Sequence, residues 1–299
     1  MILARSRALV RIHLAMGLAF AMFAGVAGAQ VGQRNFYSAL ITEGTDPDND
    51  LTLSPGWVTV AGRTQAAYSF TLEKQITANS SVLLGNALGD AARRRLQASS
   101  GVDNLEILAK WAFYLNAEHE FRTAIALDVW APTGDIEAGA GGHWRGGPMI
   151  LAEKGAGDLP DRGVFHYLRP FGVQMDAEYL PRWTGSQLDL VIFDSALSYQ
   201  LDYLSGPGSD LGADSPLRPL VFFNEFNYQQ MAWGFQATGT TPPDWRVTPG
   251  IAYATRDYQL AAGTQLGLSK LGSSACHSTG LFQIDIYFDQ IFPQLGSTF

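Results

Sequence analysis

LEILAKWAFYLNAEHEFRTAIALDVW, residues 105–130, determines how this chain folds. From residue 105 to 115 every odd-numbered position is apolar, whereas the even-numbered positions include a glutamate and a lysine. From residue 121 to 130 the odd-numbered positions are again mostly apolar, and the even-numbered ones include an arginine and an aspartate. Successive side chains of a strand point to opposite faces, so the stretch predicts two strands, each with one apolar and one polar face. Residues 116–120 between them predict a short turn.

The same alternation recurs along the chain in segments of about seven to eleven residues, close to what a tilted strand needs to cross a bilayer. An open sheet edge in lipid would leave amides unpaired, so such strands must close on themselves. The sequence therefore predicts an all-β fold, a single antiparallel transmembrane β-barrel of about 12 strands, with roughly 10 to 14 allowed. The further segments are residues 66–76, 171–179, 197–203, 222–228, 258–268 and 282–289.

A soluble β-sandwich, which buries its apolar faces, is the main alternative because it shows the same alternation. Two features favour the membrane barrel: the polar faces are rich in small and charged residues, and aromatic residues stand near several strand ends, as in an interfacial girdle. Residues 138–147, which are rich in glycine, are expected to form a long loop. The aromatic residues near strand ends are Tyr68, Phe113, Tyr179, Tyr203, Tyr258 and Phe288.

The N-terminus has the pattern of an export signal. Three arginines precede an apolar stretch, residues 14–26, and the Ala-Gly-Ala that follows is the pattern cleaved by signal peptidase. We expect cleavage before Gln30 and a location in the bacterial outer membrane. The expected organisation is a signal peptide in residues 1–29, a peripheral segment or first strand in residues 30–62, and the barrel in residues 63–299.

The composition excludes several classes of protein. Asp and Glu number 28 against 20 Lys and Arg, and such an acidic chain is a poor partner for nucleic acid. Cys276 is the single cysteine, so an intrachain disulfide is impossible. The five histidines have no metal-ligand spacing, so neither a metal nor another cofactor is expected. Beyond the N-terminal segment no run of 18 apolar residues occurs, which excludes a helical membrane protein.

A set of charged residues falls on the predicted interior faces of the strands. In a wet lumen such side chains select ions or polar solutes. In a closed interior the same side chains form a salt-bridged plug. The sequence leaves both interpretations open. The residues are Glu73, Glu106, Lys110, Arg122, Asp128, Asp176, Glu178, Asp202, Glu225, Asp285 and Asp289.

Several short motifs carry a family resemblance. Residues 101–105 (GVDNL), 110–111 (KW) and 131–135 (APTGD) resemble the outer-membrane family labelled "MetA-pathway of phenol degradation". Residues 168–173 (LRPFGV) and 287–293 (YFDQIFP) resemble segments of related uncharacterised exported β-barrel proteins. The resemblance implies an outer-membrane barrel that passes small, often hydrophobic or aromatic molecules. The family has no catalytic residues that could be assigned to positions of this chain.

This chain departs from the family pattern in two places. Asn104 intervenes between the aspartate and leucine of the first motif, and Trp111 stands where tyrosine is usual. These departures favour the looser relatives over the named family.

The expected function is passive passage of small solutes, with outer-membrane lipid and the barrel-assembly machinery as partners. No Gly-x-Ser-x-Gly or His-Glu-x-x-His motif occurs, so an enzyme is not expected. Two alternatives stay open, a non-transporting structural or adhesive barrel and a soluble periplasmic ligand-binding β-protein.

Overall fold

The computed structural model describes residues 36–60, 63–90, 100–135, 142–183, 189–204, 211–212, 214–232, 243–269 and 278–291. The expected signal peptide and Cys276 lie outside these ranges. No helix within them is long and apolar enough to cross a bilayer. The strands are β1 (Asp50–Val60), β2 (Arg63–Thr77), β3 (Ser80–Asp90), β4 (Ser100–Val102), β5 (Leu105–Asn116), β6 (Phe121–Ala131), β7 (Arg145–Gly155), β8 (Phe171–Leu180), β9 (Asp189–Gln200), β10 (Leu220–Ala232), β11 (Asp244–Ala254), β12 (Tyr258–Gly267) and β13 (Ser278–Tyr287). The short helices are η1 (Gly163–Phe165), η2 (Leu201–Leu204) and α3 (Phe288–Ile291).

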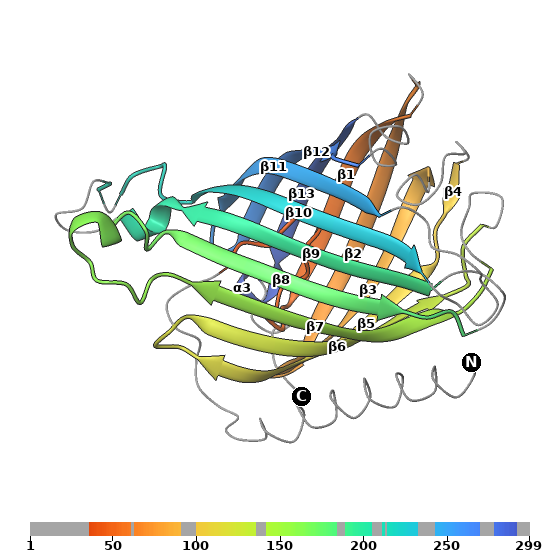
Figure 1. Ribbon diagram of the computed structural model, residues 1–299, viewed down its shortest axis with the longest axis horizontal. Coiled ribbons are helices and arrows are strands. Elements are labelled where there is room, and N and C mark those ends of the chain that lie inside the picture. The colour runs from red at the N-terminus through yellow and green to blue at the C-terminus, as the bar shows by residue number, and fades with distance from the viewer. Residues whose placement is uncertain are drawn as a thin grey trace.

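The strands form a closed antiparallel barrel (Figure 1). From β5 to β13 each strand pairs with the next along the chain, and β13 then pairs with β1. The ring continues from β1 through β2 and β3 to β5, so it contains 12 strands, while the short β4 only adds to β3. Asp50 shows the closure directly, because it faces Glu73 on one neighbouring strand and Tyr287 on the other. The predicted fold class is confirmed.

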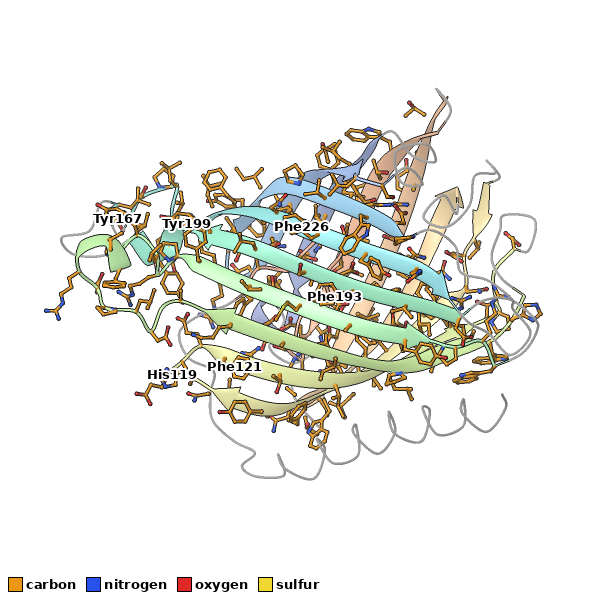
Figure 2. All side chains as sticks on the ribbon, in the orientation of Figure 1. His119, Phe121, Tyr167, Phe193, Tyr199 and Phe226 are labelled. Atoms are coloured by element: carbon orange, nitrogen blue, oxygen red, sulfur yellow. The ribbon has the colours of Figure 1, made fainter. Side chains whose placement is uncertain are left out.

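The apolar faces point outward, and the inward face of most strands is the polar one. Along β2, Tyr68, Phe70 and Leu72 are exposed on the outside, whereas the inward Glu73 is only 5% exposed. Figure 2 shows Phe193 and Phe226 on the outer surface of the wall nearest the viewer. A soluble sandwich would have buried these residues. The apolar face of the alternation therefore points outward, as it does in a membrane barrel.

Four strands of the ring, β1, β3, β7 and β11, have no counterpart among the segments predicted from alternation. Each contains glycine or proline, which usually mark turns. In particular, residues 145–147 were expected to belong to a loop but form the start of β7. The glycines are needed there because a Cβ on Gly147 would lie 1.8 Å from the carbonyl oxygen of Tyr179.

β1 starts at Asp50, within residues 30–62, where a peripheral segment or a first strand was expected. Residues 36–49, here called the internal segment, are neither peripheral nor a strand. They run inside the ring of strands, where Tyr37, Thr42 and Thr45 are each less than 5% exposed. The expectation of a peripheral segment is therefore wrong for this part, since its backbone finds its hydrogen-bond partners on the inner wall.

Candidate functional site in the barrel interior

The internal segment crosses the lumen from one wall to the other. Its hydrogen-bond partners change from β12 to β10, then to β8 and β7, and finally to β2. Most of the acceptors are carboxylates that face inward, and the donors are mainly backbone N–H groups. The backbone contacts are Ser38 N to Gln259 Oε1 (3.0 Å), Leu40 N to Glu225 Oε1 (2.7 Å), Glu43 N to Asp176 Oδ2 (2.9 Å), Thr45 N to Glu153 Oε1 (3.0 Å) and Asp48 N to Glu73 Oε1 (3.1 Å).

Glu225 is the most heavily used of these acceptors. Its carboxylate accepts the backbone N–H groups of Leu40, Ile41 and Thr42 at 2.7, 2.9 and 3.2 Å. The residue is fully buried, with 0% of its surface exposed. Hydrogen bonds to a charged acceptor are stronger than neutral ones, so one side chain fixes three consecutive residues of the internal segment.

A second attachment lies between β6 and β7. Glu153 Oε2 accepts the hydroxyl of Thr45 at 2.5 Å, and its Oε1 accepts the amide of Gln174 at 3.1 Å. Arg122 forms an ion pair with Asp46 of the internal segment and lies 3.9 Å from Glu153. The buried charges here have partners of opposite sign, as burial requires.

Lys110, on β5, provides the third attachment. Its Nζ lies 2.9 Å from Glu43 of the internal segment and 3.1 Å from Glu73 on β2, and it also donates to the carbonyl of Gly44 at 3.1 Å. Only 3% of Lys110 is exposed. An ammonium group buried to this extent needs such partners, because removal from water is costly for a charge.

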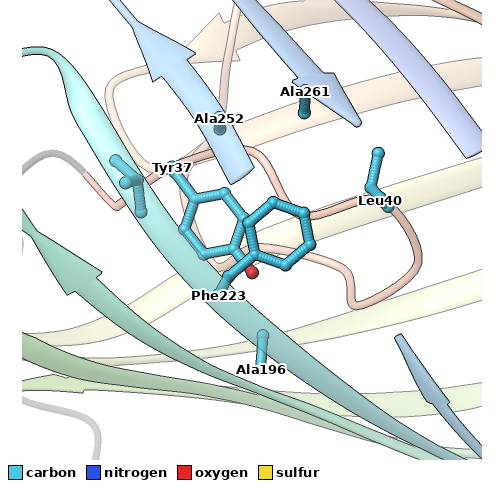
Figure 3. Close-up of a cluster of buried hydrophobic side chains, with 7 residues drawn as sticks. Tyr37, Leu40, Ala196, Phe223, Ala252 and Ala261 are labelled. Carbon is cyan, nitrogen blue, oxygen red and sulfur yellow. The ribbon is translucent and has the colours of Figure 1, made fainter. Parts of the chain in front are cut away.

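An apolar contact holds the start of the internal segment. Tyr37 stacks on Phe223 of β10, with ring centroids 5.0 Å apart and the planes inclined by 20°. Leu40, Val221 and three alanines of the inner wall, Ala196, Ala252 and Ala261, complete this cluster (Figure 3). Gly250 on β11 makes room for it, because a Cβ there would lie 2.2 Å from the ring of Phe223.

The internal segment does not fill the lumen completely. A cavity of about 200 Å³ lies between it and the inner faces of β1, β2 and β5. Hydroxyl groups and carboxylates make up most of the lining on the side of the barrel wall. The wall residues from β1, β2 and β5 are Asp50, Thr52, Ser54, Ser69, Thr71, Glu73, Glu106 and Lys110, and Leu83, Glu153, Gln174, Gln283 and Tyr287 complete the wall side of the lining.

The structure brings most of the sequence-predicted residues to the barrel interior, in three groups. Those that contact the internal segment are Glu73, Lys110, Arg122, Asp176 and Glu225. Glu106 lines the cavity. The others, Asp128, Glu178 and Asp285, are buried in the inner wall, where Asp128 accepts the indole N–H of Trp130 at 2.5 Å and Asp285 accepts the hydroxyl of Thr52 at 2.6 Å.

One of the predicted residues does not face the lumen, and another lies beyond the last strand. Asp202 lies in η2, exposed, and pairs with Arg218. Asp289 lies in α3, after the last strand has ended at Tyr287. The prediction extended both strands by a few residues, because alternation continued in the sequence after the strand itself had ended.

Several interior residues escaped the sequence analysis. Glu153 and Gln174 hold the internal segment, and Asp194 is buried on β9. Glu153 was missed because β7 begins with glycines and a proline. The acidic residues of the internal segment lie in the stretch TEGTDPDND, residues 42–50, where nothing periodic indicates a buried position. Among the described residues, no group of three His, Cys, Asp or Glu side chains is arranged to hold a metal ion.

Comparison with known proteins identifies the fold. No protein-family model and no curated protein sequence matches the chain. An outer membrane channel from Pseudomonas putida F1 matches 84% of this chain and 99% of its own, with a TM-score of 0.52 and 11% identity. The NanC porin matches 79% of this chain and 98% of its own (TM-score 0.47, 8% identity), and LpxR from Salmonella typhimurium 80% and 100% (TM-score 0.41, 11% identity). The likeness to the Pseudomonas channel shows the fold of an outer-membrane β-barrel.

Proposed function

We propose that this protein is a passive channel for small hydrophilic solutes across the bacterial outer membrane, and that the internal segment sets its bore. The observation that carries the proposal is the polar cavity left between the internal segment and the inner faces of β1, β2 and β5. A closed barrel with an apolar exterior and a hydrated, charged interior is suited to passing polar solutes.

The chemistry of the cavity bears on the solute. Thr52, Ser54, Ser69 and Thr71 present hydroxyl groups to it. This lining supports hydrophilic solutes better than the hydrophobic or aromatic molecules that the family resemblance implies. We also propose that the protein is related to the "MetA-pathway of phenol degradation" family, on the basis of the short motifs between residues 101 and 135. This proposed relationship is independent of the proposed solute.

The location and the partners belong to the same proposal. The export pattern of residues 1–29, with cleavage before Gln30, supports delivery to the periplasm. Outer-membrane lipid would then cover the exposed apolar side chains, and the barrel-assembly machinery would insert the strands. The proposed activity is passage of solute without catalysis.

Planar-bilayer recording tests the proposal. We expect the full-length mature protein to give small single-channel currents, and a variant lacking residues 36–48 to give larger ones because the constriction is gone. Heat-dependent migration in SDS gels checks that both proteins are folded barrels. Folded protein that conducts in neither form would contradict the proposal.

A second candidate is a barrel that does not transport. The observation that favours it is the dense bonding of the internal segment, including three backbone N–H groups on Glu225 alone. The two candidates differ in the same recordings, since a structural barrel would stay silent with the segment in place and conduct only after its deletion.

A further inference from the structure

The two sides of the lumen differ in how much of the inner wall stays accessible. On β7, β8, β10 and β12 the internal segment covers the wall, and Glu153, Gln174, Glu225 and Gln259 are at most 2% exposed. On β1, β2 and β5 the inward side chains that line the cavity are mostly half-buried, Glu106 among them. Water therefore reaches the side formed by β1, β2 and β5, which we call the open side.

Short side chains keep the open side wide. Thr52 of β1 lies opposite Thr71 of β2, and Ser54 lies opposite Ser69, so two neighbouring rungs carry only hydroxyl side chains. On β3, Gly85 has no side chain, and a Cβ there would lie 3.2 Å from Oε2 of Glu106. Larger residues at these positions would occupy the room that the internal segment leaves.

The charge of the open side is negative. Lys110 is the one basic residue among the cavity-lining residues of the described chain, and Glu43 and Glu73 already lie within 3.1 Å of its ammonium group. Arg122, outside the lining, pairs with Asp46, and the lining still holds more carboxyl groups than these two basic side chains can balance, so the cavity carries an excess of negative charge. A narrow, low-dielectric passage with such an excess attracts cations and excludes anions. The carboxyl groups from the internal segment and the wall are Glu43, Asp46, Asp48, Asp50, Glu73, Glu106 and Glu153. Burial raises the pKa of Asp48, so that it adds the least charge of those outside the strands.

An uncharged acceptor adds to these carboxylates. Gln174 also lines the cavity, is 2% exposed, and donates its Nε2 to the carbonyl of Tyr37 and to Glu153. Its Oε1 is buried and accepts no hydrogen bond from the described part of the chain. A buried carbonyl oxygen of this kind calls for a donor or a cation, because an unmatched polar atom is costly.

We propose that the open side is a cation-selective conduit, which passes small monovalent cations, inorganic ions and alkylammonium ions alike, in preference to anions. The inference deepens the proposed channel function and rests on it. The covered wall of β7, β8 and β10 holds the internal segment, while the open side carries the solute.

The reversal potential of the full-length protein in a potassium chloride gradient is the test. We expect a potential that indicates potassium over chloride, and a permeability ratio lowered roughly threefold in Glu106→Gln, which removes one charge a few ångströms from the path. The control is Asp202→Asn, which removes the same charge from exposed η2 and leaves the ratio unchanged. If Glu106→Gln does not fold, the reversal potential of the wild type in a gradient of methylammonium chloride serves instead, and we expect it to indicate methylammonium over chloride.

The outcomes separate the two proposals. Absence of any current would defeat the channel function itself. A current with no cation preference, or with chloride preferred, would overturn this inference alone. An equal loss of selectivity in Glu106→Gln and Asp202→Asn would overturn it as well, because selectivity would then come from the overall charge of the protein.

Discussion

The carboxylate of Glu225 accepts a hydrogen bond from the backbone N–H of Leu40 at 2.7 Å, although 185 residues separate the two. Ile41 and Thr42 donate to the same carboxylate, so β10 holds the internal segment through one side chain. A contact of this kind links the position of the segment to a residue that does not line the cavity. A substitution at Glu225 therefore loosens the internal segment without changing any side chain of the barrel wall that lines the cavity.

Glu225→Ala is expected to loosen the internal segment. Three buried N–H groups lose a charged acceptor, and each such bond contributes about 1.5–3 kcal/mol. We expect more frequent and larger openings in single-channel recordings and faster cleavage of residues 36–49 by added protease. Glu225→Gln retains one acceptor oxygen and should lie between the two. Openings no more frequent in Glu225→Ala than in the wild type would contradict the role given to this residue.

The sequence predicted the inward carboxylates because the bilayer imposes a strict alternation on lipid-facing strands. Glu73, Asp176 and Glu225 each stand next to an exposed apolar residue, namely Leu72, Met175 and Phe226, and the sequence shows this alternation locally. The internal segment has no such local rule. Its backbone conformation follows from acceptors on strands far away in the chain, so residues 36–49 read as an ordinary acidic, turn-rich stretch.

The missed strands have a related cause. Glycine and proline within β7 and β11 usually indicate turns, but here they permit close approach of neighbouring groups. Gly147 lies against the carbonyl of Tyr179, and Gly250 lies under the ring of Phe223. A sequence shows the small residue but not the neighbour for which it makes room.

Gly250→Ala is expected to disturb this packing. The new Cβ would lie 2.2 Å from the ring of Phe223, which must move and thereby weaken the stack with Tyr37. Overpacking of this kind costs about 1–3 kcal/mol, so we expect a lower unfolding temperature in detergent. Gly212→Ala is the matched control, because no atom lies within 4 Å of the added Cβ. Equal unfolding temperatures for the two variants would refute the packing argument.

Ile150→Arg tests which solvent surrounds the barrel. Ile150 lies at the centre of β7, points outward and is 55% exposed. An arginine at the middle of a lipid-facing strand costs about 2–4 kcal/mol, whereas at a water-exposed site the effect is within about 0.5 kcal/mol. Unfolding by urea in lipid vesicles measures the difference. Val164→Arg, in η1 between β7 and β8, should leave stability unchanged, and a similarly small effect at Ile150 would argue against a membrane barrel.

The pH dependence of opening should follow Asp48, which belongs to the internal segment and lies outside the strands. Burial raises the pKa of this carboxyl well above 3.8, and the negative charges of Glu73, Asp50 and Glu153 raise it further, against the opposing effect of Lys110. When the segment leaves the lumen, Asp48 enters water and regains its ordinary pKa. The closed form therefore binds the proton more tightly than the open form.

The sign of the effect follows from this difference. Below the ordinary carboxyl pKa both forms are protonated and the closed form keeps its full stability. As the pH rises above that value, the open form loses its proton first, so closure weakens by at most a factor of about ten per pH unit. We expect channel openings to become more frequent with rising pH, and Asp48→Asn to reduce that slope while favouring the closed form. Recordings between pH 4 and pH 8, with Asp202→Asn as the control, measure it. Openings that become rarer as the pH rises would show that the segment is held by the charged form of Asp48 instead.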